Sequence, residues 1–160
     1  MPDGELIRRA VTAPEIAQAR ALFEEYAASI GVDLCFQNFA EELATLPGAY
    51  APPAGTLLLA GPQARPIGCI ALRPLPGGDG AIGEVKRLYV RPDARGSGVG
   101  RTLALRVLAD ARAIGYRELK LDTLPTMAEA GALYASLGFR ECEAYYHNPV
   151  GGTVYMKLVL

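Results

Sequence analysis

The fold of this chain is decided by the stretch Arg87-Leu-Tyr-Val-Arg-Pro-Asp-Ala-Arg-Gly-Ser-Gly-Val-Gly-Arg101. An apolar strand runs into a glycine-rich turn, which opens onto a helix whose apolar residues recur at helical spacing until Gly115. Backbone N–H groups at a helix start have no intrahelical partner, and the helix dipole adds partial positive charge there. Glycines at 96, 98 and 100 let the backbone turn tightly and leave those donors uncovered. The stretch therefore predicts a loop that binds phosphate, with Arg95 and Arg101 at its edges.

Two common phosphate loops do not fit these residues. A P-loop requires Gly, four residues and then Gly-Lys-Ser/Thr, but position 95 is arginine and Arg101 stands where the lysine should be. A dinucleotide fingerprint, Gly-x-Gly-x-x-Gly, meets the same Arg101 at its last position when counted from Gly96. Both loop types are excluded.

The pattern that does match is Arg-x-x-Gly-x-Gly at residues 95–100, following a strand that ends Leu88-Tyr-Val90. It resembles the acetyl-CoA signature of the GNAT-type N-acetyltransferases. A second block, Leu133-Tyr-Ala-Ser-Leu-Gly-Phe139, resembles the helix-to-strand signature of the same family near its C-terminus. The two blocks lie in the expected order and separation.

This resemblance implies a cosubstrate, acetyl-CoA, and no metal. In the family the loop holds the coenzyme's pyrophosphate, and the preceding strand pairs with the pantetheine arm. Backbone N–H groups around Leu88 and Val90 would donate to the oxyanion. The residues implied to bind the coenzyme are Leu88, Tyr89, Val90, Arg95, Gly96, Ser97, Gly98, Val99, Gly100 and Arg101.

Composition limits the remaining possibilities. The 160 residues, 51% hydrophobic and 21% charged, suit a single domain over 1–160 with a full core. A net charge of −1 gives no basic footprint for nucleic acid, and no apolar run approaches the roughly 20 residues of a membrane span. The N-terminus lacks the build of a signal peptide. Cys35, Cys69 and Cys142 are interpreted as buried free thiols, which favours a cytoplasmic protein.

The pattern of elements predicts an α/β (α+β) fold. Strands are expected over 5–9, 56–60, 67–75, 118–122, 139–144 and 153–160, with a long one ending at Val90, and helices over 12–31, 36–46, 98–114 and 126–137. The crossover through the glycine loop makes its two strands parallel neighbours, whereas the hairpins are antiparallel. We therefore expect a mixed, mostly antiparallel sheet with a central parallel strand pair and helices on both faces. The resemblance implies the same acyl-CoA N-acyltransferase-like fold.

Moving an acetyl group from a thioester to an amine requires a neutral amine, which makes a base useful. Glu84 lies six residues before Val90, where certain family members place a base carboxylate on this strand. An exposed carboxylate or a partner of Lys86 is the alternative for Glu84. Lys86 and Arg87 are unusual in a central strand because unpaired buried charge is costly. Adjacent strand residues point to opposite faces, so at least one of the two should line a cleft or meet an acid.

Tyr134 is the expected general acid. The resemblance places it beside the thioester sulfur, where its hydroxyl would protonate or hydrogen-bond the leaving thiolate. The alternative is a core tyrosine, because its helix has an apolar face made of Met127, Ala130, Leu133, Tyr134 and Leu137.

Three residues are candidates for the acceptor side. Asp122 ends the strand parallel to the coenzyme strand, and ligands of α/β sheets collect at such carboxyl ends. Tyr146 and His147 lie in a turn-rich segment before the last strand. A structural turn and a surface imidazole are the alternatives for Asp122 and His147.

The acceptor itself stays open between small-molecule and peptide amines: small amines, amino acids, aminoglycosides, protein N-termini and lysines. A monomer and a homodimer are both compatible with these patterns. Two rival functions are transfer of a longer acyl group, because the loop recognises the CoA part, and a non-catalytic CoA-binding sensor.

Overall fold

The computed structural model describes residues 7–31, 33–34 and 38–160, and in them one mixed sheet has the strand order β1-β2-β3-β4-β5-β7-β6. Its strands are β1 (Ile7–Arg9), β2 (Thr56–Ala60), β3 (Gly68–Pro74), β4 (Ile82–Val90), β5 (Glu118–Thr123), β6 (Arg140–Cys142) and β7 (Val154–Val159). The helices are α2 (Ala13–Ile30), α3 (Phe39–Thr45), α4 (Val99–Ile114) and α5 (Ala128–Ser136), with short 3₁₀ turns η2 (Gly48–Tyr50) and η3 (Pro92–Ala94).

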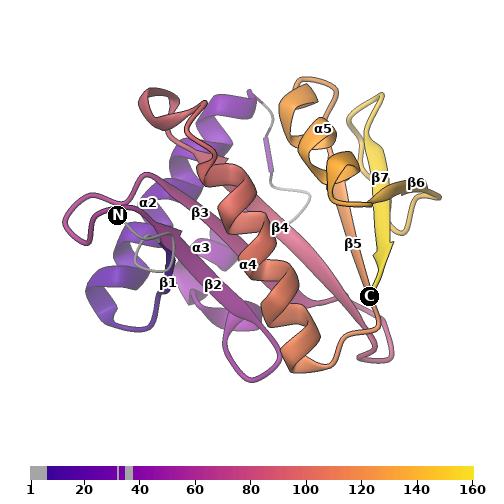
Figure 1. The fold of residues 1–160 in the computed structure, drawn as a ribbon, viewed down its shortest axis with the longest axis horizontal. Helices are drawn as coiled ribbons and strands as arrows, with labels where there is room; N and C mark the ends of the chain where they lie inside the picture. Colours follow the sequence, from indigo (N-terminus) through magenta and orange to yellow (C-terminus); the bar gives the residue numbers. More distant parts are fainter. Residues whose placement is uncertain (1–6, 32, 35–37) are drawn as a thin grey trace.

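The parallel pair is β4 and β5, and the other paired strands of the described sheet are antiparallel. This confirms the predicted fold class. The two parallel strands are in register from Ile82↔Glu118 only as far as Glu84↔Lys120. Beyond that point they diverge, and α5 lies near the open end (Figure 1).

The helix ends follow from capping residues seen in the sequence. Thr12 and Glu15 form a reciprocal capping box at the start of α2, and left-handed Gly31 ends the helix. Gly98 precedes α4 and Gly115 follows it, each with positive φ. The long helices therefore begin and end close to where the sequence predicts.

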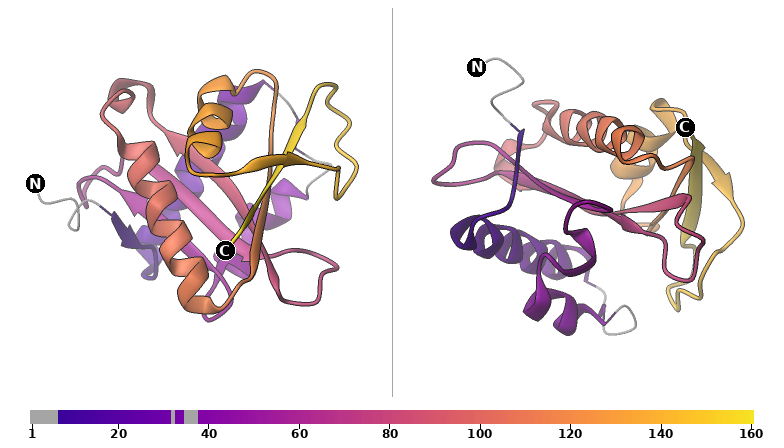
Figure 2. Two further views of the ribbon diagram at one scale, coloured as in Figure 1. Left: turned by 45° about the vertical axis from the view of Figure 1, so that its right-hand side comes forward. Right: turned by 90° about the horizontal axis from the view of Figure 1, so that it is seen from below.

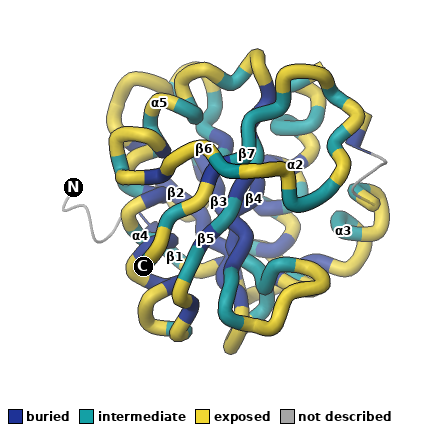
Figure 3. The backbone as a smooth tube through the Cα atoms, turned by 90° about the vertical axis from the view of Figure 1, so that its right-hand side faces the viewer, coloured by how far each residue is buried: buried dark blue, intermediate teal, exposed yellow. Residues whose placement is uncertain are grey.

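Helices cover both faces of the sheet (Figure 2). Helices α4 and α5 pack on one face over a core that includes Leu103, Leu119 and Tyr134. Helices α2 and α3 pack on the other face over a second core that includes Phe23 and Tyr50. The central strands run between these two cores, and most residues of β2, β3 and β4 are buried (Figure 3).

Some predicted boundaries differ from the structure, and some lie outside the described residues. The strand expected over 139–144 is confined to β6, because only Arg140–Cys142 pair with β7 at this edge. The second helix begins at Phe39, and residues 36 and 37 of its predicted start lie outside the described residues. The first two residues of the strand expected over 5–9 also lie outside them. None of the described helices combines the length and the apolarity that crossing a bilayer demands.

Candidate active site

The loop between β4 and α4 presents its backbone to solvent. Gly96 and Gly98 adopt the left-handed conformation, with φ of 82° and 84°, and a Cβ at either position would meet no atom within 4 Å. Among the described residues, no oxygen accepts from the backbone N–H groups of residues 96–101. These donors stand at the positive end of the 16-residue α4. The loop can therefore hold a diphosphate through main-chain amides, and this geometry fits the coenzyme.

The two arginines of the loop anchor it at either edge. Arg95 Nε donates to the Val90 carbonyl at 2.9 Å, and Arg101 Nη1 donates to Ser136 Oγ of α5 at 3.1 Å. Both side chains are exposed. Ser97 Oγ donates to the Ala94 carbonyl at 2.6 Å and tightens the turn.

An ion pair with helix α2, on the opposite face of the sheet, holds the segment that leads into the loop. Arg91 Nη2 lies 2.6 Å from Glu25 Oε2 of α2, and Arg91 Nε donates to Glu25 Oε1 at 3.0 Å. Tyr89 Oη donates to the same carboxylate at 3.3 Å. Hydrogen bonds from Arg91 hold the pKa of Glu25 below its usual value. Helix α2 thus positions the segment from which the loop departs.

Strand β4 contains a bulge at Arg87. Its register against β3 slips between Cys69↔Tyr89 and Ala71↔Lys86, and Arg87 itself has φ of 64°. Lys86 shares the α2 face with Ala71, and Arg87 also turns to that face, where it meets α2 and α3. The prediction that these neighbours point to opposite faces is therefore wrong, because the bulge interrupts the alternation of the strand.

A narrow cavity of about 30 Å³ opens where β4 and β5 separate. It is lined by Lys86, Arg87 and Leu88 of β4, Asp122 of β5, Tyr26 of α2 and Tyr134 of α5, among others. Beyond Glu84, no residue of β4 pairs with a residue of β5. Backbone N–H groups near Leu88 and Val90 are therefore positioned to donate to a group lying between the strands.

Tyr134 has features of both a core tyrosine and a residue that can act at the reaction site. The residue is 5% exposed, and its ring packs edge-on against Phe139 with 5.3 Å between ring centroids, as a core tyrosine does. The residue also lines the cavity, and no described residue hydrogen-bonds its hydroxyl. Burial raises the pKa of this hydroxyl above its usual value. It therefore stays protonated near neutral pH and can act as a donor.

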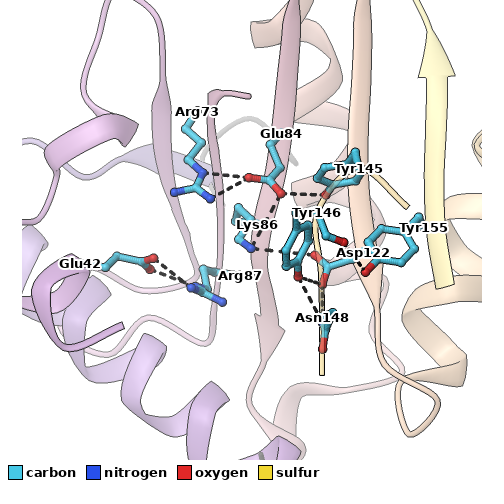
Figure 4. A network of polar contacts seen from close by, with 10 residues as sticks. All are labelled: Glu42, Arg73, Glu84, Lys86, Arg87, Asp122, Tyr145, Tyr146, Asn148 and Tyr155. Carbon is cyan, nitrogen blue, oxygen red and sulfur yellow. Dashed lines mark hydrogen bonds and ion pairs between the residues drawn. The ribbon is translucent and has the colours of Figure 1, made fainter. Parts of the chain in front are cut away.

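Glu84 lies at the centre of a buried network (Figure 4). It is 2% exposed, so the alternative of an exposed carboxylate is wrong. Arg73 holds its Oε1 through Nε at 2.9 Å and Nη2 at 2.8 Å. Tyr145 Oη donates to its Oε2 at 2.7 Å, and Lys86 Nζ lies 3.9 Å from the same oxygen. The other alternative for Glu84, a partner of Lys86, is therefore present in the structure.

Lys86 links Glu84 to Asp122. Its Nζ also lies 3.9 Å from Asp122 Oδ1, and burial lowers its pKa although both carboxylates oppose that shift. Tyr146 Oη donates to Asp122 Oδ2 at 2.5 Å, and Asn148 Nδ2 donates to it at 3.2 Å. Burial, and then the charge of Asp122, raise the pKa of Tyr146. Asp122 and Tyr146, both predicted for the acceptor side, thus come together.

Three tyrosines hold this network in place. The rings of Tyr145, Tyr146 and Tyr155 contact one another with centroid separations of 5.3 to 5.7 Å. Tyr155 Oη also donates to the Tyr146 carbonyl at 2.9 Å. The segment before β7 is therefore fixed by aromatic packing and by hydrogen bonds.

Arg87 forms a second buried pair. Its Nε and Nη2 each donate to the Glu42 carboxylate at 2.9 Å. The guanidinium carbon also lies 5.7 Å from the Tyr26 ring centre and 5.1 Å from that of Phe39. Lys86 and Arg87 both meet acids, as charged residues in a central strand should.

His147 and two of the cysteines lie apart from this network. His147 is exposed and does not line the cavity. Cys69 is fully buried, and burial raises its pKa, whereas Cys142 is only half-buried, so the prediction of a buried thiol is wrong there. Cys35 lies outside the described residues.

Sequence reasoning missed Arg73, Glu42, Tyr145 and Asn148. Arg73 could have been found from the hairpin, because a register that pairs β3 with β4 places it opposite Glu84. Glu42 and Asn148 carry no such signal, because they come from segments distant in sequence that only the tertiary fold brings to the sheet.

Known proteins share both the sequence pattern and this architecture. The model of the Acetyltransferase (GNAT) family matches residues 17–139. An uncharacterized N-acetyltransferase of Schizosaccharomyces pombe is 43% identical over 140 residues, which cover 87% of this chain and 85% of that protein. An acetyltransferase from Streptococcus agalactiae superposes with a TM-score of 0.77 at 21% identity, over 96% of this chain and 97% of that one.

A third similarity is one of fold. The structure of yncA, a putative acetyltransferase from Salmonella typhimurium with its cofactor acetyl-CoA, superposes with a TM-score of 0.66 at 22% identity, over 96% of this chain and 92% of that one. The matched family residues contain the glycine loop, the bulged strand and Tyr134. This chain belongs to the GNAT acetyltransferase family, and it is an acetyl-CoA-dependent acetyltransferase.

Proposed function

We propose that the protein transfers the acetyl group of acetyl-CoA to a primary amine by direct attack on the thioester. The main support for this proposal is the row of backbone N–H groups at residues 96–101, which have no hydrogen-bond acceptor among the described residues. This loop follows the strand that lines the cavity where β4 and β5 separate. The loop residues 95–101 hold the diphosphate. The unpaired edge of β4 at residues 88–90 holds the pantetheine arm, and the thioester lies in the cavity.

The chemistry at the thioester falls to Tyr134 and to the backbone of β4. The amine nitrogen bonds to the carbonyl carbon as the carbon–sulfur bond breaks, CoA leaves as its thiolate, and the nitrogen gives up a proton to the carboxylate that assists it. N–H groups around Leu88 and Val90 donate to the oxygen that gains charge. Burial raises the pKa of Tyr134, which makes full proton transfer costly. The Tyr134 hydroxyl therefore stabilises the departing sulfur mainly by hydrogen bonding.

A carboxylate would assist the amine as a base. Deprotonating an alkyl amine of pKa ~10.4 at pH 7 costs roughly 4–5 kcal/mol. Glu84 stays the predicted general base, but its two oxygens already accept from Arg73 and Tyr145. Asp122 lines the cavity and offers a second carboxylate for the incoming amine. In this arrangement Glu84 acts on Asp122 through Lys86, which contacts both acids.

The surroundings of the site complete the proposal. We take residues 1–160 as one catalytic domain, because a single sheet carries both cores.

Tyr146 and Asp122 border the acceptor side, whereas the exposed His147 could contact only the outer part of an acceptor. The free thiols at Cys69 and Cys142 fit a reducing cytoplasm.

Thiol release from acetyl-CoA over a panel of amines tests this function. Turnover with any amine, together with calorimetric binding of CoA, supports the transferase. Tight CoA binding without turnover across the panel would favour a CoA sensor. Turnover with a longer acyl-CoA that exceeds turnover with acetyl-CoA would favour the other rival, because the loop contacts only the CoA part.

A further inference from the structure

The guanidinium of Arg87 is held rigidly where β4 bulges. Nε and Nη2 each donate to Glu42 at 2.9 Å, and the guanidinium carbon lies 5.7 Å from the ring centre of Tyr26 and 5.1 Å from that of Phe39. Arg87 is 4% exposed, and its φ of 64° is a conformation that costs energy for arginine. Strain of this kind persists where a side chain must be placed for a function.

One nitrogen of this guanidinium is left for a ligand. Nε and Nη2 form one edge of the planar group, so Nη1 projects from the opposite corner, away from Glu42 (Figure 4). Nη1 donates to no described residue, and it is not among the described polar atoms that lack both a partner and open surface. Because Arg87 lines the cavity between β4 and β5, the open surface of Nη1 is assigned to that cavity.

The hydroxyl of Tyr26 lies beside the same guanidinium. Burial raises the pKa of this hydroxyl, and the charge of Arg87 opposes the rise. The hydroxyl donates its proton to no described residue, and it too is absent from the sealed polar atoms without a partner. Tyr26 also lines the cavity, so a cationic N–H and a neutral O–H are available there to one anionic group.

The charges around the cavity balance before a ligand arrives. The charged residues drawn in Figure 4 are cations and carboxylates in equal number: Arg73, Lys86, Arg87, Glu42, Glu84 and Asp122. Each carboxylate lies within 3.9 Å of one of the cations. A ligand with a single charge would leave a net charge in this buried region, which is costly, whereas a zwitterion keeps the balance.

The two ends of such a zwitterion must lie close together. Arg87 lines the cavity together with Asp122, the carboxylate proposed to assist the amine. The cavity they share is only about 30 Å³. A ligand that meets both residues therefore carries its amine and its anion a few atoms apart, as an amino acid does.

We propose that Arg87 and Tyr26 bind a carboxylate of the acceptor, which makes the acceptor a free amino acid. The inference rests on the proposed acetyl transfer and names its substrate class. Arg87 Nη1 donates to one carboxylate oxygen and Tyr26 Oη to the other, while the amine lies toward Asp122. An amine that lacks the carboxylate, or a peptide N-terminus, leaves both donors unpaired and is a poorer substrate.

The test compares each standard amino acid with its carboxamide, which keeps the amine and the side chain but lacks the negative charge. For the best amino acid, we expect kcat/KM to favour the carboxylate by about tenfold or more, as charge-assisted hydrogen bonds give. The amine of the carboxamide is less basic and is more often neutral, because no carboxylate stabilises its charged form. Amine basicity therefore works against the expected preference and cannot produce it.

Two conservative variants should reduce this ratio. Arg87→Lys keeps a cation for Glu42 but loses the third nitrogen, so the ratio should fall toward one. Tyr26→Phe keeps the ring beside Arg87 and loses only the hydroxyl, so the ratio should fall about fivefold, and it tests the site even if Arg87→Lys does not fold. Tyr116→Phe, at a buried tyrosine that does not line the cavity, should keep the wild-type ratio.

Calorimetry at saturating CoA gives a readout that does not need turnover. The best amino acid should bind about tenfold tighter than its carboxamide, and Tyr26→Phe should narrow the difference. Equal use and equal binding of the two by the wild type, or turnover confined to amines without a carboxylate, would overturn the proposal and leave the acetyltransferase intact. A preference unchanged in both variants would also overturn it. Amino acid binding that depends on Tyr26, without turnover of any amine, would instead count against the proposed function alone.

Discussion

The two sides of the site are built in different ways. The loop proposed to bind the coenzyme, residues 95–101, is mostly exposed, would act through its backbone and is one continuous stretch of sequence. The network around Glu84 is buried and works through side chains from β3, β4, β5 and the segment before β7. The proposed coenzyme side therefore depends on local conformation, whereas the proposed acceptor side depends on the whole tertiary fold.

This contrast predicts whether a substitution weakens coenzyme binding or lowers the stability of the fold. A change in the loop should weaken coenzyme binding and leave stability alone, because few contacts are lost. A change in the network should lower stability first, because it leaves a buried charge without its partner.

Glu84→Gln should cause the largest loss. It leaves Arg73 and Lys86 without the carboxylate they share, at a cost of about 3–5 kcal/mol. Thermal unfolding should show a Tm lower by about 10 °C. Adding Arg73→Met to Glu84→Gln removes one unpaired charge and should restore part of the loss. A Tm within about 2 °C of the wild type would show that the network is not a stabilising unit.

Gly98→Asp should weaken CoA binding while the fold persists. A charge about 5 Å from the diphosphate, at an effective dielectric of about 20, costs about 3 kcal/mol, or roughly 200-fold in Kd. Gly98→Asn is the matched control, because asparagine tolerates the left-handed conformation and lacks the charge. Calorimetry should separate the two variants. Equal affinities would mean that the diphosphate lies elsewhere.

Tyr134→Phe should lower kcat at least about tenfold, which corresponds to about 1.4 kcal/mol, with KM for acetyl-CoA little changed. The ring and its contact with Phe139 are kept, so stability should hold. The control is Tyr116→Phe, a buried tyrosine of the same core that does not line the cavity. Steady-state thiol release measures both variants. If kcat of Tyr134→Phe stays at the wild-type value, the hydroxyl has no role at the sulfur.

Asp93→Asn should have the smallest effect. Asp93 pairs with Arg65 at 3.4 Å, but their side chains are 63% and 60% exposed. Exposed pairs contribute less than about 1 kcal/mol, so urea unfolding should detect little change. If Asp93→Asn lowered the free energy of unfolding as much as Glu84→Gln, the exposed loop and the buried network would not differ in their contribution to stability.

The same contrast explains what could be predicted from sequence. Glycine spacing, the capping box at Thr12 and helical periodicity are local signals, and they led to the loop, the helices and the sheet class. The partners of Glu84 and Arg87 depend on contacts 11 and 45 residues apart, and the longer one has no local signature. The bulge at Arg87 escaped prediction because a positive φ at arginine contradicts its ordinary preference.

The bulge also determines where this chain can change in length. Gaining or losing one residue in β4 would exchange the two faces for the rest of the strand, turning Tyr89 toward α4 and pulling Arg91 off Glu25. The hairpin turn at 76–80 is fully exposed and imposes no such constraint. Insertions and deletions, natural or engineered, should therefore accumulate in that turn and be excluded from the strand beside it.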